Sequence, residues 1–128
     1  MSFPEQFKYT KDHEWLSLPS TGPTLVGVTS YAVEQLGDIV HIELPEVGES
    51  FESGASFGTI ESTKTVSDLY MPVAGKIVAV NTNLVKSPEK LQDDPYTAGW
   101  LVKVDAIAGS KTSELLSAAQ YGEYIKNN

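Results

Sequence analysis

Few residues of this chain are of types that could carry chemistry, and Lys64 is the most conspicuous of them. No lysine occurs in residues 12–63, and Lys64 then lies in the segment Glu61-Ser62-Thr63-Lys64-Thr65-Val66. Runs rich in β-branched and aromatic residues flank it, which predicts a tight reversal between two strands with the lysine near its tip. A residue at such a tip is exposed and is held by backbone rather than by packing. From position alone, an ordinary surface lysine is the simpler interpretation.

Other residues with chemical potential are sparse. The chain has no cysteine, which excludes a disulfide scaffold, a cysteine nucleophile and a thiolate metal site. Any thiol or disulfide chemistry would therefore have to come from a prosthetic group. His13 and His41 lie far apart, and His41 falls on the less apolar face of a predicted strand. No nucleophile elbow, P-loop or dinucleotide fingerprint is present. We expect no catalytic residues, no metal site and no enzymatic activity.

The net charge of −8 is concentrated in the first half of the chain, and all nine basic residues are lysines. The acids in the lysine-free residues 12–63 are Asp12, Glu14, Glu34, Asp38, Glu43, Glu46, Glu49, Glu52 and Glu61. Nucleic-acid binding is disfavoured, because such proteins rely on arginine and a basic face. Two interpretations stay open: a solvating surface, or a patch that meets basic partners and raises the rate of encounter.

Short strands must position these residues. Turn signals and alternating apolar residues predict strands at 25–29, 39–44, 57–62, 65–70, 76–81 and 100–104. In the second strand we expect Val40, Ile42 and Leu44 to share one face. This pattern predicts a mainly β fold, an antiparallel sandwich or flattened barrel with short peripheral helices and a terminal helix packed on it.

Helices are expected only at the edges of that fold. A short helix is predicted over 31–36, capped by Ser30 and ended by Gly37. One helical turn is predicted after Ser87, the cap residue, and Pro88. A C-terminal helical segment of about 113–126 contains Ser117 and Gln120 at capping-box spacing.

The length of 128 residues and the hydrophobic fraction of 41% fit a single domain spanning 1–128. No apolar run approaches the length of a membrane span, and Met1–Lys11 lacks the layout of a signal peptide. We expect a monomeric, cytoplasmic protein that contacts no membrane, or a mitochondrial one if the sequence is a processed mature form.

A series of short motifs extends along nearly the whole chain. The motifs are Tyr9-Thr10-Lys11-Asp12-His13-Glu14-Trp15, Gly27-Val28-Thr29-Ser30-Tyr31-Ala32, Leu36-Gly37-Asp38-Ile39-Val40, Leu44-Pro45-Glu46-Val47-Gly48, Phe57-Gly58-Thr59-Ile60-Glu61-Ser62-Thr63-Lys64, Ser67-Asp68-Leu69, Pro72-Val73-Ala74-Gly75, Asp94-Pro95-Tyr96 and Gly99-Trp100-Leu101. In order and spacing they resemble the H-protein family of the glycine cleavage system, whose members are lipoyl carriers.

The resemblance implies a fold of the lipoyl/biotinyl-carrier type, with lipoic acid joined to Lys64 by an amide. The dithiolane on this arm would supply the sulfur chemistry that the chain lacks. Biotin carriers place their lysine between two methionines, whereas the neighbours here are Thr63 and Thr65. Lipoyl domains of 2-oxoacid dehydrogenases are usually tethered by flexible linkers, which are absent here. The family commonly has Val and Ala where Thr63 and Thr65 stand, a departure that bears on how a lipoylating enzyme reads the site.

The resemblance also implies the partners. A pyridoxal-phosphate-dependent glycine decarboxylase would load an aminomethyl group onto the arm, and a tetrahydrofolate-dependent aminomethyltransferase would remove it. A dihydrolipoamide dehydrogenase would then reoxidise the dithiol, and a lipoylating enzyme would attach the cofactor. Two alternatives stay open: an H-like protein that mainly relays octanoyl or lipoyl groups, and an unmodified interaction module.

Residues for docking and recognition follow from the same resemblance. The loaded arm carries an ammonium group, and the family implies a protective cleft formed by Asp12, His13, Glu14 and Asp68. Recognition by the lipoylating enzyme is assigned to Glu61 and Gly48. Asp12 stands where the family often has Ser, and surface acids are the alternative interpretation of all these carboxylates.

Overall fold

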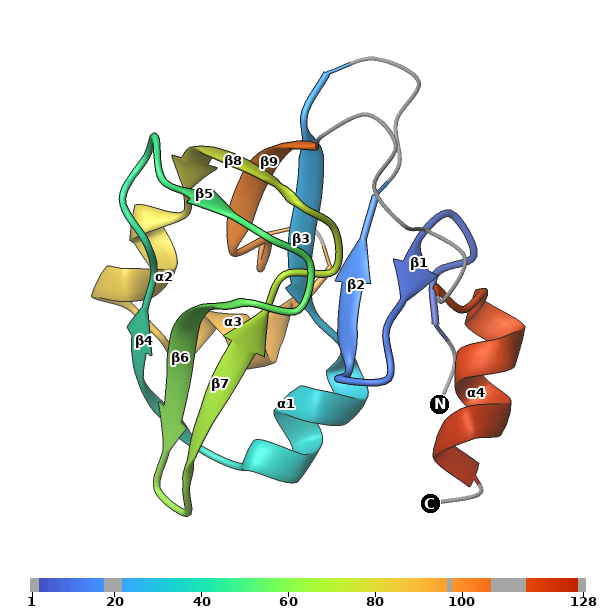
Figure 1. Cartoon of the computed structure of the whole chain (residues 1–128). Helices are drawn as coiled ribbons and strands as arrows, with labels where there is room; N and C mark the ends of the chain where they lie inside the picture. The colour runs from blue at the N-terminus through green and yellow to red at the C-terminus, as the bar shows by residue number, and fades with distance from the viewer. Residues whose placement is uncertain (1–2, 18–21, 97, 107–114, 127–128) are drawn as a thin grey trace.

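Two antiparallel sheets form the molecule, with the core between them (Figure 1). The computed structural model describes residues 3–17, 22–96, 98–106 and 115–126. The larger sheet has the strand order β1-β2-β3-β9-β8-β5, and the smaller has the order β4-β6-β7. The strands of the larger sheet are β1 (Lys8–Tyr9), β2 (Glu14–Leu16), β3 (Thr24–Val28), β5 (Ser50–Phe51), β8 (Gly75–Val80) and β9 (Val102–Ala106). Those of the smaller sheet are β4 (Ile39–Glu43), β6 (Ser56–Ser62) and β7 (Val66–Tyr70). The expected mainly β fold of antiparallel sheets is confirmed.

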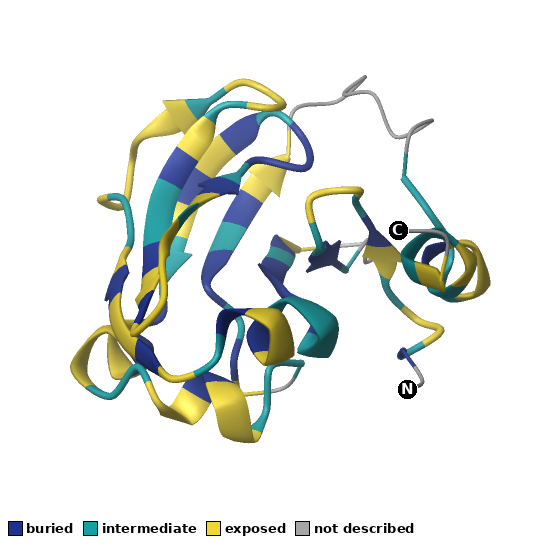
Figure 2. Cartoon of the chain, turned by 90° about the horizontal axis from the view of Figure 1, so that it is seen from below, coloured by how far each residue is buried: buried dark blue, intermediate teal, exposed yellow. Residues whose placement is uncertain are grey.

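The core is apolar and draws on both sheets. Each sheet turns one face inward, and alternate residues of its strands are buried there (Figure 2). Inward residues of the larger sheet include Val26, Val28, Ile77, Val102 and Val104, and those of the smaller include Ile42, Ile60 and Leu69. The two sheets therefore stabilise each other through burial of these side chains.

Helix α1 (Ser30–Leu36) closes one end of this core with its buried residues Val33 and Leu36. Thr29, not the predicted Ser30, is the N-cap, because its Oγ1 accepts the N–H of Ala32 at 3.2 Å. Gly37 ends the helix as predicted, at φ 83° and ψ −144°, a conformation that only glycine adopts readily.

Aromatic residues form a second cluster that attaches the C-terminal helix α4 (Ala118–Lys126) to β1 and β2. The rings of Tyr9 and Tyr121 stack at 5.0 Å between centroids, and α4 lies alongside β1 in Figure 1. Trp15 packs against Gly27 on β3, where any Cβ atom would meet the indole at 2.6 Å. Large aromatic side chains therefore pack α4 against β1 and Trp15 of β2 against β3.

The structure corrects several predicted elements. The final helix begins at Ala118, because residues 115–117 are not helical and residues 113–114 lie outside the described residues. Ser117 and Gln120 nevertheless make both bonds of the predicted capping box, at 2.9 and 3.2 Å. Val40 is 50% exposed and does not share the inward face of Ile42, because the register of β4 on β6 shifts between Ile39 and His41.

Two short helices occupy the long connection after β8. They are α2 (Thr82–Lys86) and α3 (Lys90–Asp93). The sequence predicts only the second of them, and Ser87 proves to be the C-cap of α2 while Glu89 is the N-cap of α3. The last strand begins at Val102, so Trp100 precedes it. The three short strands β1, β2 and β5 were not predicted, since two or three residues carry too little alternation to detect.

Candidate functional site

Lys64 lies at the tip of the hairpin formed by β6 and β7, as predicted. The turn is built by Ser62, whose hydroxyl oxygen accepts the backbone N–H groups of Lys64 and Thr65, both at 3.2 Å. The N–H of Ser62 donates to the carbonyl of Thr65 at 2.8 Å. Backbone and one serine thus hold the tip, and Lys64 itself is exposed. The ε-amino group is therefore accessible to a modifying enzyme.

The tip rests against the end of α1. The N–H of Thr63 donates to the carbonyl of Asp38 at 3.0 Å, and a Cβ atom placed on Gly37 would lie 3.3 Å from Cε of Lys64. The lysine side chain therefore starts out along the C-terminal end of α1. Figure 1 shows this approach of the hairpin to the helix.

A small cavity opens between α1 and the hairpin, and we call it the Glu14 cleft. Its volume is about 160 Å³. The apolar lining residues are Val28, Ala32, Leu36, Ile60 and Leu69, and the polar ones are Asp12, His13, Glu14, Gln35, Ser67 and Asp68. An apolar cavity of roughly 150 Å³ accommodates a benzene-sized ring. The Glu14 cleft is thus large enough for a five-membered dithiolane or a short chain of similar volume.

Glu14 is the buried acid of this cleft, with 2% of its surface exposed. Its Oε2 accepts the backbone N–H of Tyr70 at 2.6 Å, whereas its Oε1 has no hydrogen-bond partner among the described residues. Burial raises the pKa of Glu14 well above its usual value, and the charge of Asp12 adds to this, while the bond from the Tyr70 backbone and the nearby Thr10 side chain oppose it. A buried carboxyl oxygen without a hydrogen-bond partner costs free energy. A bound group with an N–H donor would satisfy this oxygen.

His13 lies beside Glu14 in the turn between β1 and β2. Its backbone has φ 67°, a left-handed conformation that is uncommon for residues other than glycine. The Nδ1 atom is 2.8 Å from the hydroxyl of Tyr121. Burial lowers the pKa of His13, although the neighbouring Asp12 opposes that change. The lowered pKa favours the neutral ring, which is less suited than Glu14 to receive a cation.

The other two predicted acids are placed less deeply. Asp12 is exposed at the mouth of the cleft. Asp68 contributes to the lining, but β7 alternates, so that its side chain lies on the face opposite to Leu69. There its Oδ1 is 3.5 Å from the hydroxyl of Ser56. Ser67, opposite the buried Ile60, shares the inward face instead.

Sequence reasoning missed Ser67 as a cleft residue, along with Ala32 and Gln35 of α1. The period-two pattern of β7, with the buried Leu69 as reference, was the signal that would have placed Ser67 inward and Asp68 outward. No comparable signal places α1 against the hairpin.

The two residues predicted for lipoylation recognition are not brought together. Glu61 is exposed near the tip, opposite His41 on one side and Val66 on the other. Gly48 follows the far end of β4, where its N–H donates to the carbonyl of Ile77 at 2.8 Å. Because Glu43 pairs with Thr59 and Ile39 with Ser62, Gly48 lies at the end of the small sheet remote from Lys64. A recognition role for both residues would need an enzyme that contacts the whole length of that sheet.

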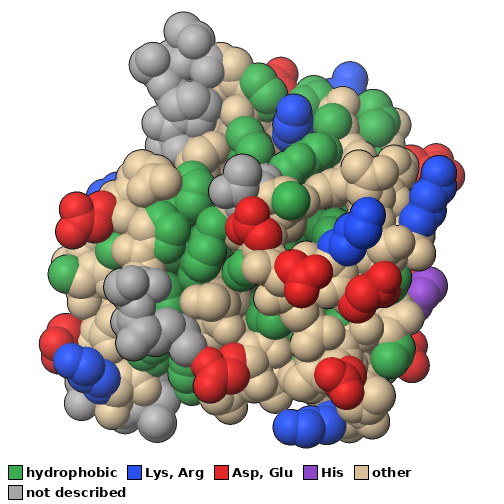
Figure 3. Space-filling view, turned by 180° about the vertical axis from the view of Figure 1, so that it is seen from behind, with side chains coloured by type: hydrophobic (Ala, Val, Ile, Leu, Met, Phe, Trp, Pro, Cys, Tyr) green, Lys and Arg blue, Asp and Glu red, His purple; other side chains and the backbone are tan. Residues whose placement is uncertain are grey.

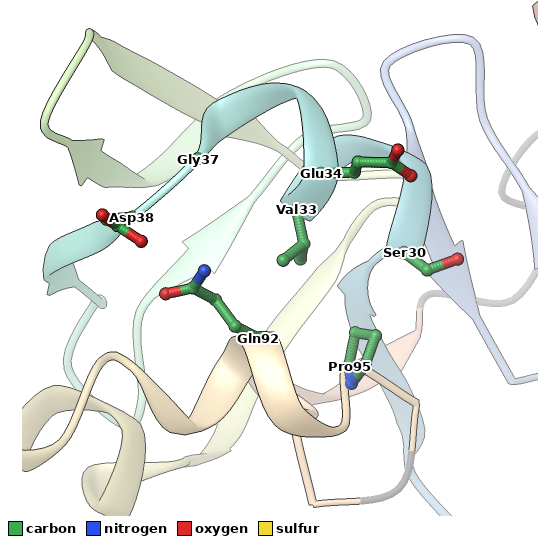
Figure 4. Close-up of a pocket in the computed structure, with 7 residues that line it drawn as sticks. All are labelled: Ser30, Val33, Glu34, Gly37, Asp38, Gln92 and Pro95. Atoms are coloured by element: carbon green, nitrogen blue, oxygen red, sulfur yellow. The ribbon is translucent and has the colours of Figure 1, made fainter.

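A second cavity, of about 300 Å³, lies on the other side of α1 (Figure 4). It is lined by Ser30, Val33, Glu34, Gly37, Asp38, Gln92 and Pro95. The amide oxygen of Gln92 accepts the N–H of Ile39 at 3.2 Å, which joins α3 to β4. Its polar side chains have their own contacts or face solvent, so it lacks the buried free acceptor of the Glu14 cleft.

Acidic side chains on the rear face are spaced singly among lysines and uncharged atoms (Figure 3). His41 is exposed, with its Nε2 at 3.5 Å from Oε1 of Glu43. Within the described ranges, no group of three or more His, Asp or Glu side chains is placed to hold a metal ion. No helix among these residues has the length and hydropathy to cross a membrane.

The antiparallel sheets, the short helices and the C-terminal helix form a fold of the lipoyl-carrier type, in which the exposed Lys64 lies on a hairpin tip beside a small cleft with a buried acid. The family model for "Glycine cleavage H-protein" matches residues 7–128, and this chain belongs to that family.

Individual proteins agree with this assignment. The glycine cleavage system H protein of Staphylococcus epidermidis is 49% identical over 125 residues, which are 98% of each chain. That of Synechococcus sp. is 44% identical over 126 residues, or 98% of this chain and 96% of the relative. The crystal structure of a glycine cleavage system H protein from Mycobacterium marinum superposes with a TM-score of 0.86 at 49% identity, covering 98% of both chains. The predicted family and fold type are confirmed.

Proposed function

We propose that this chain is the lipoyl-bearing carrier of a glycine cleavage system, with lipoic acid joined to Lys64 by an amide. The observation that carries the proposal is the position of Lys64 on the hairpin tip, next to a cleft whose buried acid has a free oxygen. Family membership agrees with this role. When bound, lipoic acid would supply the disulfide and dithiol chemistry for which the chain has no cysteine.

The distance between lysine and cleft suits such an arm. The cleft is lined by Ser67, Asp68 and Leu69 of β7. At about 3.3 Å per strand residue, these lie at most roughly 10 to 17 Å from Lys64 along the chain. A lysine side chain extended by an acyl chain spans this range, and the course of Lys64 past Gly37 directs it towards α1.

In the proposed role, the chain protects a cationic cargo from water. The aminomethyl group on sulfur is protonated at neutral pH, and water would cleave it to thiol, formaldehyde and ammonium. Glu14 would accept a hydrogen bond from this ammonium at Oε1, while Tyr70 fixes Oε2. The apolar residues Leu36 and Ile60 would exclude water from the same cleft. Asp12 at the mouth would add attraction for a cation, and the outward Asp68 would contribute less.

The chain itself acts as a protein substrate and not as a catalyst. We propose that it presents Lys64 in turn to the glycine decarboxylase, the aminomethyltransferase, the dihydrolipoamide dehydrogenase and a lipoylating enzyme. The decarboxylase and the transferase have their own cofactors, so the carrier needs only an accessible arm and a protected resting place for it. A relay of neutral octanoyl groups would have no use for a buried carboxyl group, so Glu14 favours the glycine cleavage role.

Intact-mass analysis after incubation with a lipoylating enzyme and lipoate tests the attachment. We expect a single lipoyl addition to the wild-type chain and none to Lys64→Arg, with Lys76→Arg as the matched control on another exposed lysine. An unmodified wild-type chain beside an active lipoylating enzyme would contradict the proposal and favour an unmodified interaction module.

A further inference from the structure

One tyrosine of the C-terminal helix contacts His13, a residue that lines the Glu14 cleft. Tyr121 is fully buried, and its hydroxyl lies 2.8 Å from Nδ1 of His13 and 2.8 Å from Oγ1 of Thr29. Oγ1 of Thr29 in turn accepts the N–H of Ala32 as the N-cap of α1. This hydroxyl on α4 therefore adds a side-chain link between the turn before β2 and the start of α1, beside the backbone bond from the N–H of Thr29 to the carbonyl of His13 at 3.0 Å.

This link connects two residues of the cleft wall, because Thr29 accepts the N–H of Ala32. His13 and Ala32 line the cleft, and Glu14 follows His13 directly in the chain. A shift of His13 away from α1 would displace the carboxyl group of Glu14, since the two residues share a peptide unit. The width of the cleft and the position of its acid thus depend on how the turn and the helix are held together.

The turn at His13 needs such support. His13 donates its N–H to the carbonyl of Thr10 at 3.1 Å, and it adopts φ 67° at a position where this kind of turn usually has glycine. A residue with a side chain holds a left-handed conformation only when its surroundings stabilise it. Here the imidazole is held by the Tyr121 hydroxyl and by the ring of Tyr31, 5.0 Å away between centroids.

We propose that Tyr121 is a positioning residue for the docked arm: its hydroxyl ties His13 to the N-cap of α1 and so fixes Glu14 in the cleft wall. This inference rests on the proposed function of the cleft. It gives the C-terminal helix a part in the site, although α4 does not itself line the cleft.

The hydrogen bonds of this link can all be oriented in the same sense, each hydroxyl accepting one and donating one. Thr29 Oγ1 accepts from the backbone of Ala32 and donates its own hydrogen to Tyr121, which donates to Nδ1 of His13. Burial lowers the pKa of His13 and raises that of Tyr121, so a neutral imidazole and a protonated phenol meet. All four groups are then satisfied, which makes the link a fixed feature of the unmodified protein.

Tyr121→Phe removes the hydroxyl link, and it keeps both the ring packing and the backbone bond between Thr29 and His13. The ring contacts of Tyr121, stacked on Tyr9 at 5.0 Å and edge-on to Phe3 at 4.8 Å, need no hydroxyl. Tyr9→Phe is the matched control, because Tyr9 is equally buried in the same cluster but its hydroxyl donates to the carbonyl of Pro4 at 2.6 Å, away from the cleft.

Two measurements test the positioning role of the Tyr121 hydroxyl. In the unmodified protein, NMR should show a changed Nδ1 shift for His13 and faster amide exchange at Ala32 in Tyr121→Phe only. In the lipoylated and loaded protein without transferase, ammonia release should be about fivefold faster in Tyr121→Phe, the factor that corresponds to ~1 kcal/mol for one neutral hydrogen bond. Tyr9→Phe should match the wild type in both measurements.

A second variant keeps the inference testable if Tyr121→Phe does not fold. His13→Gly suits the left-handed turn but lacks the link to Tyr121, so the loaded variant should also release ammonia faster than the wild type. The double variant with Tyr121→Phe should release ammonia no faster than His13→Gly alone. Wild-type ammonia release in Tyr121→Phe, or equal acceleration in Tyr9→Phe, would overturn the inference. Glu14→Ala separates the two proposals: if it is faster while Tyr121→Phe is not, only the positioning role fails, and if neither is faster, the protective cleft fails too.

Discussion

Oε2 of Glu14 accepts the backbone N–H of Tyr70 at 2.6 Å, and this bond joins β2 of the large sheet to β7 of the small one. Tyr70 is the last residue of β7, and the first residue of β7 follows the hairpin tip that carries Lys64. Glu14 and Lys64 are therefore linked through one hairpin, and the other oxygen of Glu14 has no hydrogen-bond partner among the described residues.

Glu14→Ala should shorten the lifetime of the loaded carrier. A hydrogen bond between charged groups contributes about 1.5–3 kcal/mol, so ammonia release without transferase should rise roughly tenfold or more. Lipoylation and reoxidation of the arm should stay near the wild-type rates, because Glu14 lies away from the tip. Asp68→Ala should have a smaller effect, since its side chain lies on the outer face of β7. The exposed Glu61→Gln serves as control, and equal release in Glu14→Ala and the wild type would refute the protective role.

The raised pKa of Glu14 predicts a pH-dependent stability. The folded chain binds the proton of Glu14 more tightly than the unfolded chain, so the stability associated with this proton is complete below the ordinary pKa of 4.5 and is lost as the pH rises through the folded value. Glu14→Gln should lack this loss and gain stability relative to the wild type as the pH increases. Urea unfolding of the unmodified chain at several pH values measures it. Parallel pH profiles for both proteins would show that burial does not hold this proton.

The sequence predicted the hairpin and its lysine because strand patterns and the reversal are local. It also identified Glu14 through a motif, although the depth of its burial depends on Tyr70, far along the chain. The link between His13 and Tyr121 joins residues separated by 108 positions. No periodicity or spacing can reveal such a contact, because it depends on where α4 packs. The outward turn of Val40 had a different cause, since the register shift on β6 breaks the alternation on which the prediction relied.

Acid residues of the first half should steer association with the decarboxylase and the transferase. Glu43→Lys with Glu46→Lys should slow association more than dissociation, and association should weaken as salt rises, because exposed charges are screened over roughly 8–10 Å. Glu89→Lys with Asp93→Lys reverses the same charge on the exposed side of α3 and should change the rates less. Surface plasmon resonance at several salt concentrations measures both. Rates that are indifferent to salt would make the acids a solubilising surface only.

Two glycines should respond to alanine in opposite directions. Gly37→Ala should destabilise the fold by about 1–3 kcal/mol, because φ 83° with ψ −144° is strained for any side chain. Gly122→Ala should stabilise it by about 0.5–1 kcal/mol, because Gly122 lies within α4 and an added Cβ meets nothing within 4 Å. Chemical unfolding gives both values. If Gly37→Ala left the free energy of unfolding unchanged, the end of α1 would be less fixed than the structure indicates. The same would then hold for the hairpin tip that contacts it.

The most direct test of the central claim is glycine turnover in a reconstituted system. Lipoylated wild-type chain, or Lys64→Arg carried through the same lipoylation, is combined with glycine decarboxylase, aminomethyltransferase, dihydrolipoamide dehydrogenase, tetrahydrofolate and NAD, and carbon dioxide release from glycine is followed. We expect steady turnover with the wild type and none above background with Lys64→Arg, while Lys76→Arg supports the wild-type rate. Turnover sustained by Lys64→Arg, or a lipoylated wild type that supports none, would contradict the assignment of this chain as a carrier that works through Lys64.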